Sequence, residues 1–179
     1  MNRQGTWMQT VSGKVFWPLD PRPEELDIND IAHALGMMCR YGGHCNRFYS
    51  VAEHSVLMAS YAKQTLGADL ARIALMHDAT EAYLSDVIRP VKAHLSNYRE
   101  IEERLWLCIA ERFSLPQVIP DEVHHLDNCI LRDEMEALHM PPPMEWNIPN
   151  QRLGVHITGW DPKFAGWAFL GMYQKLWGE

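Results

Sequence analysis

Apolar side chains recur at helical spacing along nearly all of this chain, and this spacing restricts its fold more than any other feature. Alternation typical of strands is limited to Thr10–Trp17 and Gly154–Ile157. We therefore expect an all-α fold, a bundle of about six helices with a small N-terminal hairpin. The expected helices cover residues 28–38, 50–66, 70–87, 101–113, 121–138 and 161–177.

The length of 179 residues is sufficient for a core without disulfides or a structural metal. A chain of this size buries roughly 70% of the surface of its unfolded form. No repeat or low-complexity linker divides it, which predicts one domain over residues 1–179. The four cysteines include no C-x-x-C pair, and we expect free thiols.

The charge balance excludes some partners. The chain has 16 Lys and Arg against 23 Asp and Glu, a net charge of −7, and no basic run. These values argue against duplex nucleic acid and anionic membranes as partners. No apolar stretch is long enough to span a membrane and the first residues lack a signal-peptide pattern, so we expect a cytoplasmic protein.

The dipeptide His77-Asp78 interrupts an apolar helical run. Burying an imidazole beside a carboxylate is costly unless both are compensated, and a divalent transition metal compensates both. The alternative is a core histidine satisfied by its neighbouring aspartate. His54 and Asp127 favour the metal, because each lies on the apolar face of another expected helix, and helical bundles build metal sites in this way.

Several motifs together resemble the HD-domain phosphohydrolases, in particular the bacterial 5′-deoxynucleotidases and the phage-encoded deoxynucleoside triphosphohydrolases. The resemblance covers about residues 28–138, the expected metal core, and leaves the helix at 161–177 for packing or oligomer contacts. The motifs are Phe48-Tyr49-Ser50-Val51-Ala52-Glu53-His54-Ser55, His77-Asp78-Ala79-Thr80-Glu81-Ala82-Tyr83, Pro90-Val91-Lys92 and Leu126-Asp127, with Glu134 seven residues on.

The resemblance implies that His54, His77, Asp78 and Asp127 bind one divalent cation. Zn, Mn, Co or Fe suit these ligands, and additional Mg or Mn can accompany the substrate phosphates. It also assigns proton transfer to Glu81, which on a continuous helix shares the face of His77. The alternative for Glu81 is an ordinary carboxylate at a helix end.

The resemblance further implies that Lys92, two residues after Pro90, holds the substrate phosphate; the alternative is a solvated loop lysine. It places Arg40 near the nucleotide, although Tyr41-Gly42-Gly43 follows where the deoxynucleotidases have Trp and Pro, which leaves base and sugar selection open. Further substrate candidates of lower weight are Pro90, His44, which would replace His54 as ligand in another register, Trp17, which would stack on a base, and Arg47, Asp86 and Arg89. His124 and His125 are interpreted as surface groups or groups behind the ligands.

The expected function is hydrolysis of the 5′ phosphoester of a small deoxynucleotide in a bacterial or phage-infected cytosol, with mono- and triphosphate substrates both open. One alternative is a catalytically silent nucleotide-binding or sensing module. Another, a cyclic phosphodiesterase or a two-metal oxidase, would require more histidine ligands than His124-His125 supply. Aromatic residues clustered near the C-terminus, in and just before the last expected helix, suggest a homo-oligomer. They are Trp160, Phe164, Trp167, Phe169, Tyr173 and Trp177.

Overall fold

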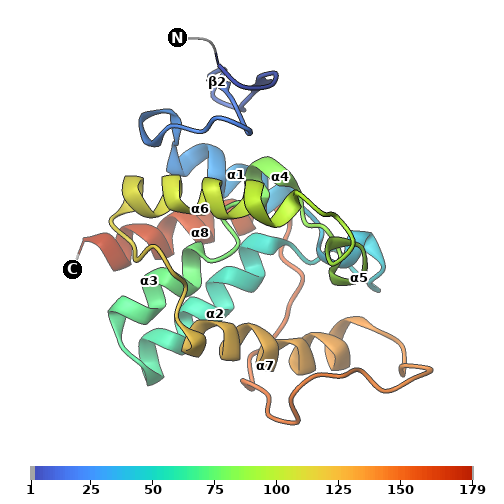
Figure 1. Ribbon diagram of the computed structural model, residues 1–179. Coiled ribbons are helices and arrows are strands. Elements are labelled where there is room, and N and C mark those ends of the chain that lie inside the picture. Colours follow the sequence, from blue (N-terminus) through green and yellow to red (C-terminus); the bar gives the residue numbers. More distant parts are fainter. Residues whose placement is uncertain (1–2, 179) are drawn as a thin grey trace.

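The computed structural model describes residues 3–178 and is mostly helical, as the sequence predicts (Figure 1). Besides six longer helices, the described residues form two short α-helices, α4 and α5, of four residues each. Two short 3-10 helices, η1 and η2, flank α1. The longer helices of the described residues are α1 (Ile28–Met37), α2 (Val51–Thr65), α3 (Ala68–Met76), α6 (Tyr98–Phe113), α7 (Asp121–Leu138) and α8 (Pro162–Trp177). The short ones are α4 (Glu81–Leu84), α5 (Arg89–Lys92), η1 (Pro23–Glu25) and η2 (Arg40–Gly43).

The predicted N-terminal hairpin is confirmed. Strands β1 (Met8–Gln9) and β2 (Val15–Phe16) pair antiparallel, and the Thr10 amide donates to the Lys14 carbonyl in the connecting turn. The second expected strand, at residues 154–157, is absent, and an irregular segment takes its place.

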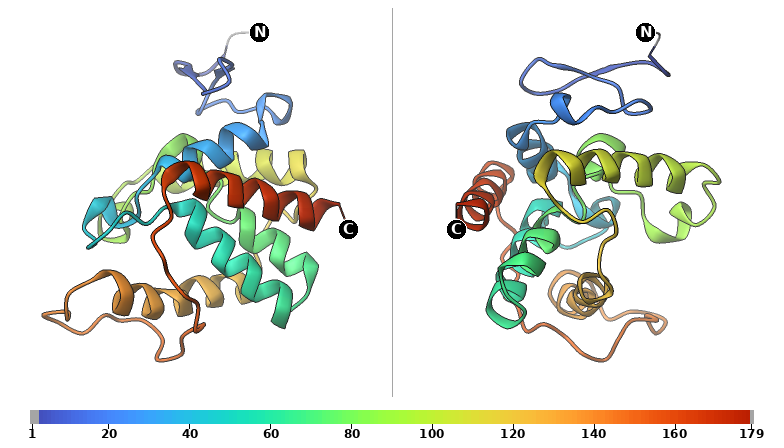
Figure 2. Two further views of the ribbon diagram at one scale, coloured as in Figure 1. Left: turned by 180° about the vertical axis from the view of Figure 1, so that it is seen from behind. Right: turned by 60° about the vertical axis from the view of Figure 1, so that its left-hand side comes forward.

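Helix α2 lies at the centre of the bundle, packed against α3 and α8, and α8 also packs against α1. In Figure 1, α6 passes above the α2–α3 pair and α7 below it, and Figure 2 shows the same two helices well separated. The core includes the fully buried Leu35, Met58, Leu75, Ile109 and Ile130, one from each of five helices. α7 also contacts both α2 and α3, so the parts of the chain that carry the candidate ligands lie close together.

The expected third helix is shorter than predicted. α3 ends at Met76, and the chain continues in tight turns in which the Ala79 amide donates to the Met76 carbonyl. Adjacent residues on an α-helix point about 100° apart, whereas this turn brings the side chains of His77 and Asp78 together. The expectation that Glu81 shares a continuous helical face with His77 is thus wrong, because α4 begins at Glu81.

Ser50 and Glu53 resemble a capping box at the start of α2, and only half of it forms. The Ser50 hydroxyl accepts from the Glu53 amide at 3.0 Å. The buried Glu53 carboxylate instead accepts from three amides before α8, those of Thr158, Gly159 and Trp160. Asp133 accepts from two further amides of the same connection, which runs below α7 in Figure 1. These two carboxylates attach the long connection between α7 and α8 to the bundle.

Helix α8 begins as predicted, with the Asp161 carboxylate accepting from the amides of Lys163 and Phe164. It crosses α1 so closely that a Cβ at Gly36 would lie 2.6 Å from the Pro162 carbonyl oxygen. Phe164 and Trp167 are about half exposed, while other aromatic residues of this region pack within the chain. The four cysteines are free, and no described helix has the length and hydropathy to cross a membrane.

Candidate metal centre

Three side chains from different parts of the chain converge in the bundle: His54 from the first turns of α2, His77 from the turn after α3, and Asp127 from α7. One ligand atom of each lies within 4.8 Å of the other two. The Nε2 atom of His54 is 3.4 Å from that of His77 and 3.4 Å from Oδ1 of Asp127. These three residues, which the sequence singles out, can hold a metal ion.

Asp78, the fourth predicted ligand, adjoins the same cluster. Its Oδ2 atom lies 3.2 Å from Nε2 of His77 and 3.6 Å from Nε2 of His54. Asp78 and Asp127 thus present one carboxylate oxygen each to the two imidazoles.

The second nitrogen of each imidazole fixes the orientation of its ring. Nδ1 of His54 donates to Oε1 of Glu134 at 2.6 Å, and Nδ1 of His77 donates to the Ala74 carbonyl oxygen at 2.8 Å. Both partners are acceptors only, so the proton of the neutral imidazole belongs on Nδ1 and the lone pair on Nε2. Metal-bound histidines are commonly held in this way.

The spacing of these atoms fits a metal ion. Ligands about 2.1 Å from a tetrahedral cation lie about 3.4 Å from one another, and the separations between ligand atoms around His54 and His77 run from 3.2 to 3.9 Å. Two imidazole lone pairs facing two carboxylates repel one another unless a proton or a cation lies among them. Burial and Arg40 lower the pKa of His54, but Glu134 and Asp127 together outweigh them and raise it to about 9. In the metal-free protein a proton on His54 therefore relieves this repulsion.

Glu134 is the buried group on which this arrangement depends. It accepts from His54 and also from the hydroxyls of Tyr49, at 3.0 Å, and Tyr41. The Arg40 guanidinium lies 3.5 Å from its other oxygen. Burial acts to raise the pKa of Glu134, but the charges of Arg40 and His54 together outweigh it and lower the pKa to about 2, so the group is ionised. The sequence motifs include Glu134 and Tyr49 without indicating this contact, whereas Tyr41 lies outside them.

Arg40 lies directly beside the cluster. Its buried guanidinium lies between Glu134 and Asp78, 3.2 Å from the Asp78 oxygen that faces the histidines. Burial raises the pKa of Asp78, but His77, His54 and Arg40 together lower it. Arg40 therefore neutralises the carboxylates of the cluster from behind.

Glu81 is buried on the first turn of α4, and its Oε2 atom has no hydrogen-bond partner among the described residues. Burial raises its pKa well above the usual value, and the charges of Asp78 and Asp86 add to this effect. Glu81 is thus an unengaged carboxyl group within electrostatic reach of the cluster.

Two cations of α5 reach across to neighbouring helices. Arg89 donates to Oδ2 of Asp127 at 2.8 Å and to the side chain of Asn128. Lys92 forms an ion pair of 2.6 Å with Glu102 of α6. Arg89 therefore holds the Asp127 oxygen that faces away from His54.

The cluster opens into a cleft of about 630 Å³ between α6 and α7. His77, Asp78 and Asp127 form its floor, Lys92 lies at its edge, and the other lining residues come from α6, α7 and the loop between them. Those are Arg99, Glu102, Glu103, Trp106, Leu107, Gln117, Val118, Ile119 and His124, and Thr80 of the turn before α4 also lines the cleft. The cleft volume is within the usual range for small-molecule sites.

The remaining candidates lie elsewhere. His44 is an exposed residue at the end of η2, and Pro90 is an exposed residue of α5. Trp17 packs under the Arg3 guanidinium beside the N-terminal hairpin. None of the three is among the residues that line the cleft.

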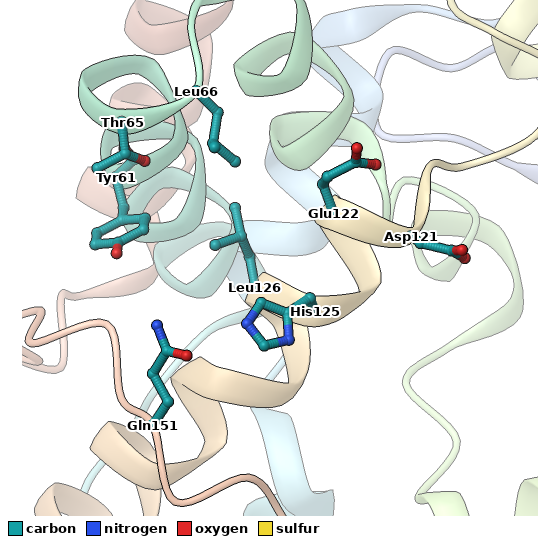
Figure 3. A pocket seen from close by; sticks show the side chains of 8 residues that line it. All are labelled: Tyr61, Thr65, Leu66, Asp121, Glu122, His125, Leu126 and Gln151. Atoms are coloured by element: carbon teal, nitrogen blue, oxygen red, sulfur yellow. The ribbon is translucent and has the colours of Figure 1, made fainter.

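A second hollow, of about 490 Å³, lies on the other side of α7 (Figure 3). Tyr61, Thr65 and Leu66 at the end of α2 form one wall, and His125 with its neighbours on α7 forms the other. His124 thus lines the cleft and His125 this hollow, where its ring lies 3.5 Å from the Cys129 sulfur.

The fold and the cluster define a helical protein with a His, His and Asp set, one member buried and two half-buried, that could hold a divalent metal. No family model matches the chain. It is 37% identical over 174 residues to the uncharacterized protein YfdR of Escherichia coli K12, which covers 97% of this chain and 95% of YfdR. The chain therefore belongs to the family of YfdR. It is also 40% identical to the uncharacterized protein RCAP_rcc00048 of Rhodobacter capsulatus over 120 residues, 64% of this chain and 61% of that protein.

Proposed function

We propose that this chain is a metal-dependent phosphohydrolase of the HD-domain class that cleaves the 5′ phosphoester of deoxyribonucleotides. The observation that carries the proposal is the convergence of two oriented imidazoles and the Asp127 carboxylate at a cleft, with the Asp78 carboxylate beside both imidazoles. His54, His77, Asp78 and Asp127 would hold the metal. A divalent cation in such a site supplies Lewis-acid activation of a phosphate ester and of water.

The other residues near the cluster supply what this reaction needs from the protein. Lys92 lies on the edge of the cleft, where its ammonium group would attract a substrate phosphate. Glu81 has a carboxylate oxygen without a hydrogen-bond partner among the described residues, and burial raises its pKa, as is common for carboxyl groups that act as general acids or bases. We assign phosphate binding to Lys92 and proton transfer to Glu81.

The size and charge of the site favour a small substrate. The cleft volume suits a single nucleotide, and an acidic chain with few cations around its cleft would bind a polynucleotide poorly. Nucleoside plus phosphate from a monophosphate, or nucleoside plus triphosphate from a triphosphate, are both products of the same cleavage.

Hydrolysis of a panel of ribo- and deoxynucleoside mono-, di- and triphosphates tests the proposal, with the protein loaded with Mn, Co, Zn or Mg and the products separated by chromatography. Asp78→Asn should abolish both turnover and metal binding while helical circular dichroism persists. The matched control is Asp69→Asn, because Asp69 is exposed on α3 and forms a surface ion pair with Arg72. Activity retained in Asp78→Asn would show that the centre is elsewhere, and metal and nucleotide binding without turnover would indicate a sensing module.

A further inference from the structure

The wall that α6 contributes to the cleft changes in chemical character along its length. Arg99, Glu102, Glu103, Trp106 and Leu107 recur at intervals of three and one, so they occupy one stripe of the helix. The stripe starts with a cation, continues with two carboxylates and ends with apolar side chains. At a rise of 1.5 Å per residue, Arg99 and Leu107 are about 12 Å apart along the helix axis.

The cationic end of the cleft is shared by two elements. Lys92 of α5 joins Arg99 there, and its ion pair with Glu102 draws α5 toward α6. The Lys92 ammonium group also lies over the ring of Tyr98, in the first turn of α6. Arg89 of the same short helix α5 donates to Asp127 of the cluster, so a phosphate in contact with the metal would also be within the field of Lys92 and Arg99.

The opposite end is apolar, and part of it is exposed. Leu107 is 46% exposed and Val118 is 78% exposed, while Ile119 lies beside them in the loop before α7. The Trp106 indole N–H donates to the Gln117 carbonyl oxygen at 3.0 Å and thereby fixes that loop to α6. An apolar surface on a fixed frame, next to a charged site, is typical of a subsite for the apolar part of a polar ligand.

We propose that the cleft binds a nucleotide lengthwise, with its phosphate between the metal cluster, Lys92 and Arg99 and its nucleobase against Leu107, Val118 and Ile119. This inference rests on the proposed function and assigns the two ends of the substrate to two named surfaces. Aliphatic side chains contact the ring of any base in much the same way. We therefore expect this subsite to require a base but to discriminate little between the different bases.

Val118→Asp tests the base subsite, because it places a charge in the apolar wall at an exposed position where the fold tolerates it. The substrates are a deoxynucleoside monophosphate and deoxyribose 5-phosphate, which differ in the presence of the base. We expect KM for the nucleotide to rise at least tenfold and KM for deoxyribose 5-phosphate to stay unchanged. The matched control is Val11→Asp, at an exposed valine in the turn of the hairpin, which should change neither.

Arg99→Ala tests the other end. It should raise KM for both substrates by a similar factor, because both carry the phosphate. The inference is overturned if Val118→Asp raises KM for both substrates alike or for neither, or if Arg99→Ala leaves both values unchanged.

Equilibrium binding of the same nucleotide to the metal-loaded protein separates this inference from the proposed hydrolysis. If no ester is hydrolysed but Val118→Asp weakens nucleotide binding tenfold and Val11→Asp does not, the subsite stands and the hydrolytic function fails. If esters are hydrolysed and Val118→Asp binds and turns over the nucleotide like the original chain, the hydrolytic function stands and the subsite fails. Absence of nucleotide binding in the original chain overturns both.

Discussion

Oε1 of Glu134 lies 2.6 Å from Nδ1 of His54, and both side chains are completely buried. A carboxylate in this position raises the basicity of the imidazole and points its Nε2 atom at the cluster. Glu134 is seven residues beyond Asp127, two turns along α7, so one helix supplies a candidate ligand and the group that orients another.

We expect Glu134→Gln to weaken metal binding by about 10- to 100-fold, because an amide orients His54 less strongly and no longer raises its basicity. Titration against a competing chelator measures the dissociation constant. Glu136→Gln is the matched control, since Glu136 lies on the same helix in a surface ion pair with Arg152. Equal metal affinity in the two variants would show that Glu134 does not support the site.

Glu81→Gln should leave the metal content unchanged and reduce kcat by at least 100-fold, because the amide keeps the shape of the side chain but transfers no proton. Metal content by elemental analysis and single-turnover hydrolysis are measured on the same preparation. A fall in metal content would make Glu81 a ligand, and unchanged kcat would remove its role in proton transfer.

Glu53→Gln should lower the free energy of unfolding by about 2 kcal/mol, because hydrogen bonds to a charged acceptor are the stronger ones and this carboxylate accepts three. Urea denaturation followed by circular dichroism measures the loss. Ser50→Ala, which removes the cap of the same helix, should cost about 1 kcal/mol. A Glu53→Gln variant as stable as the original chain would contradict the importance given to this contact.

The stability of the chain should fall at acidic pH in part through Asp27. Its pKa is lowered to about 2, chiefly by the hydrogen bond from Lys14 and then by that from the Asn29 amide. A carboxylate with a depressed pKa stabilises the fold above its unfolded value of about 4 and loses this contribution as the pH falls toward 2. The stability difference between the original chain and Asp27→Asn should therefore be larger at pH 6 than at pH 2. A difference independent of pH would contradict this assignment.

The helices were predictable because their apolar stripes are regular, as in α1 and α7. The break after Met76 was not, because the apolar spacing continues through it and only the tertiary environment draws His77 and Asp78 to the same side. The contacts of Glu53 could not be predicted for a similar reason. Its position matches a capping box at the start of α2, but its hydrogen-bond partners lie more than a hundred residues away.

The candidate cluster could be predicted from its residue types, since buried histidines and aspartates on apolar faces are uncommon. Its supporting groups could not. The backbone of Tyr41 has a φ of 58°, a left-handed conformation that local sequence does not specify for tyrosine, and it is this loop that brings Arg40 and Tyr41 to Glu134. The cationic end of the cleft depends on α5, which the sequence indicates only as a turn.

Arg40 carries its positive charge to the carboxylates of the cluster whether or not a cation is present. We therefore expect the bundle to fold without a metal, so that metal binding would be a separate, reversible event. Under these conditions the ion acquired depends on the concentrations of competing metals around the protein as well as on the ligands. Growth medium and purification buffers would then determine which metal the isolated protein contains.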